Sequence, residues 1–90
     1  MRKFTVGEVE GTVIRYNPIR GMFVVEVVEY GEYMVFELLD SVDIELGNII
    51  AGDLRALGSV ELRHLQAGRM FSAYGQSGPS SKQAALRLIS

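Results

Sequence analysis

A small all-β barrel of five antiparallel strands, followed by a short C-terminal helix, is the fold that the sequence predicts. The chain has 90 residues, of which 48% are hydrophobic, and this suits one domain with a single core. From Gly11 onwards, short segments rich in β-branched and aromatic residues alternate with turn signals. Three consecutive strands joined by short turns form a meander, and in a chain of this length we expect the meander to curl into a barrel.

The stretch from Gly11 to Val25, GTVIRYNPIRGMFVV, predicts the first hairpin. Its first strand carries a β-branched run at residues 12–14, and its second strand, residues 22–28, is almost continuously apolar. Between them, the sequence Asn-Pro-Ile-Arg-Gly favours a turn, because Asn can bond its own backbone, Pro presets φ and Gly21 accepts a positive φ. A second turn, residues 29–32, with Gly31 in the same role, leads into a third strand at residues 33–39.

Alternation along these strands predicts which side chains are buried. Glu26 marks the more exposed face of the second strand, so we expect the opposite face to lie in the core. The residues that we assign to the core are Val9, Val13, Phe23, Val25, Val27, Met34, Phe36 and Leu38. The residues that we assign to the outer face of the second and third strands are Met22, Val24, Glu26, Val28, Tyr33, Val35 and Glu37.

The later strands are marked less sharply. Residues 1–7 form a lead-in, residues 46–54 supply the fourth strand, and residues 69–74 supply the fifth. Residues 56–68 are left unassigned, although residues 60–63 alternate. The breaker cluster at residues 75–80 ends the barrel, so the domain boundaries are 1–78 for the barrel and 79–90 for a C-terminal segment.

Two structures are possible for the C-terminal segment. We favour a short helix, because Ser80 and Gln83 have capping-box spacing and residues 84–88 include good helix formers. The alternative is a closing strand. In that case strands four and five become residues 69–74 and 83–89, and residues 46–65 become an inserted hairpin of a barrel that still has five strands.

The charge pattern argues against a large nucleic-acid surface. The formal net charge is −2, and no Lys or Arg lies between Arg20 and Arg55. A nucleic-acid surface normally carries a basic stripe, whereas this span is acidic throughout and reads more simply as a solvated face. The remaining basic residues are scattered along the sequence, so only the fold could assemble them into a patch. The acids between the two arginines are Glu26, Glu29, Glu32, Glu37, Asp40, Asp43, Glu45 and Asp53.

Composition also limits the chemistry. The absence of cysteine excludes disulfides, thiolate metal sites and a cysteine nucleophile. His64 is the single histidine, so no histidine-based metal site or catalytic triad can form, and we expect it on the surface beside Arg63. We therefore expect no metal, no cofactor and no enzyme activity. Without an apolar run of signal-peptide or membrane-span length, the expected location is the cytoplasm.

The first hairpin resembles the opening hairpin of the cold-shock domain, a small barrel of the oligonucleotide/oligosaccharide-binding (OB) type. The pattern of that family is G-T-V-K-W-F-N-P-x-K-G-F-G-F-I. The residues that match it outright are Gly11, Thr12, Val13, Asn17, Pro18 and Gly21, with conservative replacements at Tyr16, Arg20 and Val25. The resemblance implies an OB-type barrel whose second and third strands stack unpaired bases on aromatic side chains.

Residue by residue, that aromatic platform is depleted here. The Trp of the family's first strand is Arg15, and the two platform Phe positions are Met22 and Val24. The second motif, V-F-V-H, aligns with residues 34–37, which places Val35 at the stacking Phe and Glu37 at the His.

Two functions therefore remain open. The resemblance implies weak binding of single-stranded RNA or DNA, and the residues that it assigns to the site are Arg15, Tyr16, Arg20, Met22, Tyr33 and Val35. The alternative is a protein-interaction or oligomerisation module, in which a partner protein or a second copy meets the exposed, apolar-centred face of the second and third strands. That face can also be covered from within the chain, by residues 56–68 or by the C-terminal segment, which would make Leu86 and Leu88 packing partners.

Overall fold

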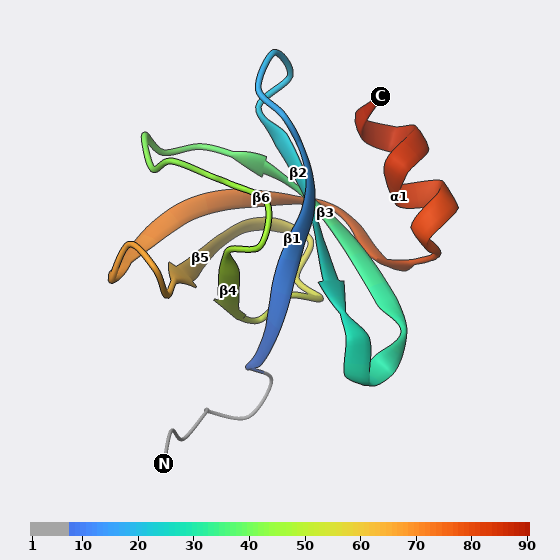
Figure 1. The fold of residues 1–90 in the computed structure, drawn as a ribbon, viewed down its shortest axis with the longest axis horizontal. Coiled ribbons are helices and arrows are strands. Elements are labelled where there is room, and N and C mark those ends of the chain that lie inside the picture. The colour runs from blue at the N-terminus through green and yellow to red at the C-terminus, as the bar shows by residue number, and fades with distance from the viewer. Residues whose placement is uncertain (1–7) are drawn as a thin grey trace.

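The computed structural model describes residues 8–90 as a closed antiparallel barrel with one short helix against its outer wall (Figure 1). The lead-in expected at residues 1–7 lies outside the described residues. The strands pair in the order β1-β2-β3-β6-β5-β4, and pairing of β1 with β4 closes the barrel. The elements are β1 (Val9–Asn17), β2 (Met22–Val27), the 3₁₀ turn η1 (Val28–Tyr30), β3 (Glu32–Leu38), β4 (Ile49–Gly52), β5 (Gly58–His64), β6 (Arg69–Ser80) and α1 (Lys82–Ile89).

The expected antiparallel barrel is confirmed, but the number of strands is wrong. The described chain has six strands, because the unassigned segment 56–68 forms β5 and pairs with both β4 and β6. The alternative with a closing strand at residues 83–89 is wrong, because α1 occupies these residues, and β4 and β5 form part of the barrel wall instead of an inserted hairpin. Strand β6 also runs through the breaker cluster as far as Ser80. Two shifts in its register with β3 accommodate these turn-type residues, and Gly75 lies so close to Ala56 that a side chain there would collide with the Ala56 carbonyl.

The two glycine turns form as expected. Gly21 closes the β1–β2 turn with φ of +66°, and Gly31 ends η1 with φ of +63°. Both values lie in the left-handed region that glycine tolerates best. The turn residues therefore fix where β2 and β3 begin, and with that the register of the whole meander.

The barrel core fills the interior, and the predicted faces of β2 and β3 are correct. Phe23 is fully buried, and its ring centroid lies 5.6 Å from that of Phe36 and 6.2 Å from that of Phe71. The loop at residues 39–48 adds two further apolar side chains, Val42 and Ile44, to this core. The barrel core consists of Val13, Phe23, Val25, Val27, Met34, Phe36, Val42, Ile44, Ile50, Leu54, Leu62, Phe71 and Ala73, with Val9, Tyr16, Leu38 and Val60 packed against it.

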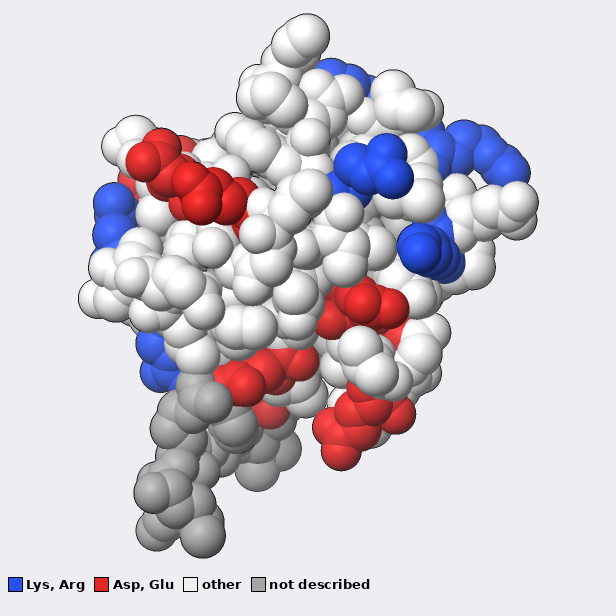
Figure 2. Space-filling view, viewed as in Figure 1, with Lys and Arg blue, Asp and Glu red and all other residues white. Residues whose placement is uncertain are grey.

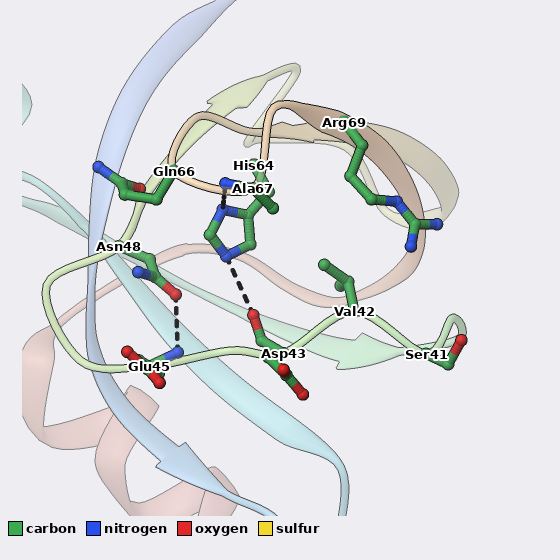
Figure 3. Close-up of a pocket in the computed structure, with 9 residues that line it drawn as sticks. All are labelled: Ser41, Val42, Asp43, Glu45, Asn48, His64, Gln66, Ala67 and Arg69. Atoms are coloured by element: carbon green, nitrogen blue, oxygen red, sulfur yellow. Dashed lines mark hydrogen bonds between the residues drawn. The ribbon is translucent and has the colours of Figure 1, made fainter.

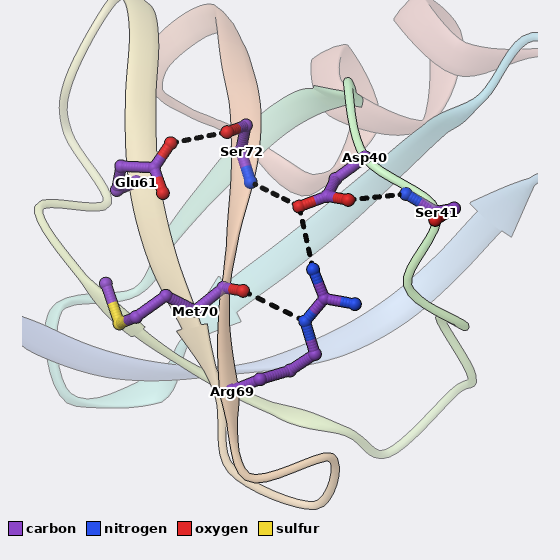
Figure 4. A network of polar contacts seen from close by, with 6 residues as sticks. All are labelled: Asp40, Ser41, Glu61, Arg69, Met70 and Ser72. Carbon is purple, nitrogen blue, oxygen red and sulfur yellow. Dashed lines mark hydrogen bonds and ion pairs between the residues drawn. The ribbon is translucent and has the colours of Figure 1, made fainter.

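A carboxylate ties this loop to β6 from outside (Figure 4). Asp40 accepts a hydrogen bond from the backbone N–H of Ser41 at 2.7 Å and pairs with the Arg69 guanidinium at 3.0 Å. The Ser41 N–H above all, helped by the N–H of Ser72 and by Arg69, holds the pKa of the Asp40 carboxyl below its ordinary value. The Ser72 hydroxyl of β6 donates in turn to the Glu61 carboxylate of the neighbouring strand β5.

The C-terminal helix is confirmed, with its cap one residue later than predicted. The Ser81 hydroxyl accepts a hydrogen bond from the Ala84 N–H at 3.1 Å and is the N-cap. Ser80 instead donates its hydroxyl to the Tyr33 carbonyl at 2.8 Å, and so belongs to the end of β6. Among residues 8–90, no helix has the length and apolarity needed to cross a membrane.

Candidate functional site

Helix α1 covers the outer face of β2 and β3. Ala85 and Ile89 lie one helical turn apart and are buried against β2 and β3. Leu86 is partly buried beside them, whereas Leu88 is 40% exposed and is not the packing partner we expected. The helix cluster consists of Met22, Val24, Val35, Ala85 and Ile89, with Ile14, Tyr33 and Leu86 packed against it.

This covering corrects two of the sequence-based expectations. Met22 and Val35 were assigned to a binding surface, but they are 6% and 0% exposed and cannot touch a ligand while α1 is in place. For the same reason, this face is not open to a partner protein or to a second copy. The face is covered because its centre is apolar, and burial of apolar surface away from water is favourable. The apolar side of α1 provides this burial.

The turn of the first hairpin holds the end of α1. The Asn17 side-chain amide donates to the Ile89 carbonyl at 2.7 Å, and the Arg20 guanidinium donates to the main-chain oxygens of Leu88 at 3.0 Å and Ser90 at 2.8 Å. The last carbonyls of a helix lack partners within it and attract positive charge, so both contacts stabilise the docked helix. The residues that carry the cold-shock resemblance in this turn therefore have a structural role here.

A β-bulge turns Tyr16 away from the outer face. The register of β1 with β2 shifts between Val13 and Arg15, so Tyr16 pairs with Phe23 and packs against the barrel core. Tyr16 and Tyr33, which we expected to share one stacking surface, are therefore not brought together on it. Arg15 keeps the outward position and is exposed.

Tyr33 lies half-buried at the margin of the helix cluster. Its hydroxyl donates to the Glu26 carboxylate at 2.8 Å, with both side chains on the outer face of the β2–β3 pair. This hydrogen bond, together with desolvation, raises the pKa of the Tyr33 phenol above its ordinary value.

We expect Tyr33 to ionise at a lower pH in a Glu26→Gln variant than in the wild type, because the charged acceptor is lost. A folded-state pKa above 10.0 means that this hydrogen bond stabilises the fold below pH 10 and that the contribution is lost as the pH rises through the folded-state pKa. Absorbance at 295 nm follows the ionisation, and Tyr33→Phe identifies which transition belongs to this residue. Identical alkaline titrations of the wild type and Glu26→Gln would contradict the assignment.

A recess lies between α1 and the first hairpin. Its volume is about 250 Å³, and it is lined by both apolar and polar groups. This is smaller than a typical small-molecule pocket of about 300–1,000 Å³. The residues that line the recess are Arg15, Tyr16, Asn17, Pro18, Leu86, Ile89 and Ser90.

Positive side chains gather beside α1, and one of them, Arg15, lines this recess. Figure 2 shows Lys and Arg concentrated beside α1, while most of the acidic side chains in that view lie over other parts of the surface. We call Arg15, Arg20, Lys82 and Arg87 the cationic edge; all are exposed, and they come from the first hairpin and from α1. Lys82 and Arg87 were not among the predicted site residues, because nothing in their own segment shows that α1 docks beside the first hairpin.

The residues of the cationic edge differ from two basic residues elsewhere on the barrel, which are ion-paired. Arg55 pairs with Glu32 at 2.8 Å and Arg69 pairs with Asp40 at 3.0 Å. Within residues 8–90, no Asp or Glu side chain forms an ion pair with a residue of the cationic edge. Arg20 is engaged with the main-chain oxygens at the end of α1, whereas the charges of Arg15, Lys82 and Arg87 have no such partner among the described residues. These cations give a chain of net negative charge a locally positive area.

A second cavity, of about 370 Å³, lies under the loop at residues 41–48 (Figure 3). His64 forms its floor and is 3% exposed, so the expectation of a surface histidine was wrong. Its Nδ1 accepts from the Ala67 N–H at 3.1 Å, which leaves Nε2 to donate to the Asp43 carbonyl at 3.0 Å. Nε2 thus holds the loop against β5, while Nδ1 fixes the turn between β5 and β6, and we assign His64 a structural role.

Comparison of the chain with protein-family models, curated proteins and solved structures finds no match. A function therefore has to be inferred from the residues themselves.

Proposed function

We propose that this protein is a small binding module for single-stranded nucleic acid, without catalytic activity, and that its ligand lies along the cationic edge. The observation that carries the proposal is a set of exposed cations on the first hairpin and α1, without Asp or Glu ion-pair partners among the described residues, one of which lines a small recess between these two elements. Unpaired Lys and Arg side chains bind phosphates with release of counterions, and this interaction does not depend on base sequence. We expect binding that is modest in affinity and broad in sequence preference.

Kinship with the cold-shock domain and its OB-type barrel is part of this proposal. It is supported by the β1–β2–β3 meander, which is built on the hairpin from Gly11 to Val25. The sixth strand and the covering helix depart from the family's pattern. Because α1 occupies the place of the family's stacking surface, the proposed site moves to the edge that α1 shares with the hairpin.

The residues of the edge contribute differently. Lys82, Arg87 and Arg15 are exposed and have no Asp or Glu ion-pair partner among the described residues, so they can contact phosphates directly. Arg20 already donates one nitrogen, Nη1, to the end of α1 and has its remaining donors for a ligand. The recess can accept one base, with Tyr16 and Pro18 among its walls.

Reversing two charges of α1 tests the proposal. At low salt, we expect the double variant Lys82→Glu/Arg87→Glu to bind a 15-nucleotide deoxythymidine strand about 10–100-fold more weakly than the wild type. If each residue of the edge contacts one phosphate, the wild-type log–log salt slope should be about −2 to −3, and the variant should lose roughly 1.4 of it. Fluorescence anisotropy of a labelled strand measures both quantities.

A matched control separates local contact from net charge. Arg63 lies on the outer face of β5, away from α1, and is not part of the edge. Arg63→Glu gives the same change in net charge as Arg87→Glu alone and should weaken binding by less than about threefold, and by less than Arg87→Glu does. Equal losses in these two single variants would contradict a site at the cationic edge, and a wild type without saturable binding at low salt would contradict the proposed function.

The second candidate is a protein-interaction module, and a different surface favours it. Leu39, Met70 and Tyr74 are 51%, 47% and 43% exposed and lie on or beside the wall formed by β3 and β6. Apolar side chains near acidic neighbours such as Glu37 suit a protein contact better than a nucleic acid. Self-association in analytical ultracentrifugation that is lost in Tyr74→Lys would favour this candidate over the first.

A further inference from the structure

The tip of the first hairpin exposes an apolar side chain that has no role in the fold. Ile19 is 96% exposed, the highest value among the large hydrophobic residues described. The tip projects beyond the barrel beside the end of α1, and in Figure 2 it forms an uncharged projection next to the basic side chains (Figures 1 and 2). A single exposed apolar side chain is common on protein surfaces, so it is the setting of Ile19, and not its exposure alone, that suggests a role.

The tip is also rigidly held. The Asn17 side-chain oxygen accepts from the N–H groups of Ile19 at 3.1 Å and Arg20 at 3.2 Å, and Pro18 fixes φ between them. The same turn is fastened to α1 through the side chains of Asn17 and Arg20. A side chain on such a turn loses little backbone entropy when it binds a ligand.

We infer that Ile19 is a wedge that inserts between two neighbouring bases of the bound strand. This inference rests on the proposed function and specifies how the ligand's bases are contacted. Proteins that insert apolar side chains between bases place cations beside them, so that phosphate contacts offset the cost of unstacking. In a single strand that cost is small, because no base pair has to be opened.

The surroundings favour Ile19 over other exposed apolar residues. Val28 and Leu46 are also strongly exposed, at 75% and 64%, but each is next to a glutamate in the chain, and Leu57, at 68%, has no basic residue next to it. A phosphate backbone would be repelled beside the glutamates. Ile19 is instead followed directly by Arg20, a residue of the cationic edge.

A strand that carries both a terminal fluorophore and one internal 2-aminopurine tests the inference. Anisotropy of the fluorophore reports affinity, and the 2-aminopurine brightens when it loses a stacked neighbour. We expect wild-type binding to increase the 2-aminopurine signal. In Ile19→Ser, the increase should disappear and affinity should fall about 5–10-fold, while the salt slope stays unchanged because every cation remains. Ile19→Phe should restore both the affinity and the signal.

Leu57→Ser is the matched control, since Leu57 is 68% exposed and is not part of the cationic edge or the recess. It should leave binding and the 2-aminopurine signal unchanged, and both serine variants should melt like the wild type. If Ile19→Ser binds and brightens the probe as the wild type does, the wedge is overturned while the proposed function stands. If the wild type binds no strand, both fail, and self-association that is lost in Ile19→Ser would identify the tip as a protein contact instead.

Discussion

Replacing Phe23 with alanine is expected to destabilise the protein by about 3–5 kcal/mol. The Phe23 ring is fully buried and contacts the rings of Phe36 and Phe71, so its loss leaves a cavity at the centre of the barrel core. A domain of 90 residues is typically stable by about 5–13 kcal/mol, so this single change removes a large share of the total. Urea denaturation followed by circular dichroism measures the difference.

Ile19→Ala provides the control for this prediction, because it removes an apolar side chain from a 96% exposed position. Its free energy of unfolding should stay within about 0.5 kcal/mol of the wild type. If Phe23→Ala melted within a few degrees of the wild type, the assignment of the inner face of β2 would be wrong.

Replacing Ile89 with asparagine is expected to release α1 from the barrel. Ile89 is 2% exposed in the helix cluster, and an amide in its place would be buried without a partner. An isolated helix of eight residues is not stable in water, so α1 should unfold when it detaches. We expect the substitution to weaken the docking of α1 by about 2–4 kcal/mol, and the loss cannot exceed the free energy of docking itself. The separate barrel core should stay folded.

Limited digestion with trypsin measures this release, because Lys82 and Arg87 become cleavable once α1 unfolds. Nucleic-acid binding should weaken at the same time by at least about tenfold, since the cationic edge depends on a docked helix. Leu88→Asn makes the same chemical change on the exposed side of α1, and it should alter neither digestion nor binding. Tighter binding in Ile89→Asn would contradict a site at the edge and would place the ligand on the face beneath α1.

The parts of the fold that sequence could predict are those with a strong local pattern. The faces of β2 and β3 followed from alternation and from Glu26, and the first two turns followed from Gly21 and Gly31. Strand β5 was missed because it is a short amphipathic segment between two glycines, and it becomes a strand only through pairing on both sides. The length of β6 was missed because its turn-type residues are accommodated by irregular pairing with β3.

The candidate site was harder to predict, because it depends on contacts distant in the chain. Arg20 and the carbonyl of Leu88 that it caps are separated by 68 residues, and no pattern near either residue indicates that they meet. The inward turn of Tyr16 depends on a bulge at Ile14, which periodicity alone does not reveal. The sequence predicted that the outer face of β2 and β3 is apolar at its centre, but not which element covers it. The packing of α1 against this face shows that the helix does.

Mapping amide chemical shifts during a titration with the 15-nucleotide deoxythymidine strand, at low salt, tests the cationic edge most directly. The edge predicts saturable shifts at residues 15–21 and 82–90, with little change at Ser59 and Ser72 on the wall formed by β5 and β6. Shifts confined to that wall, or no saturable shift anywhere, would contradict it.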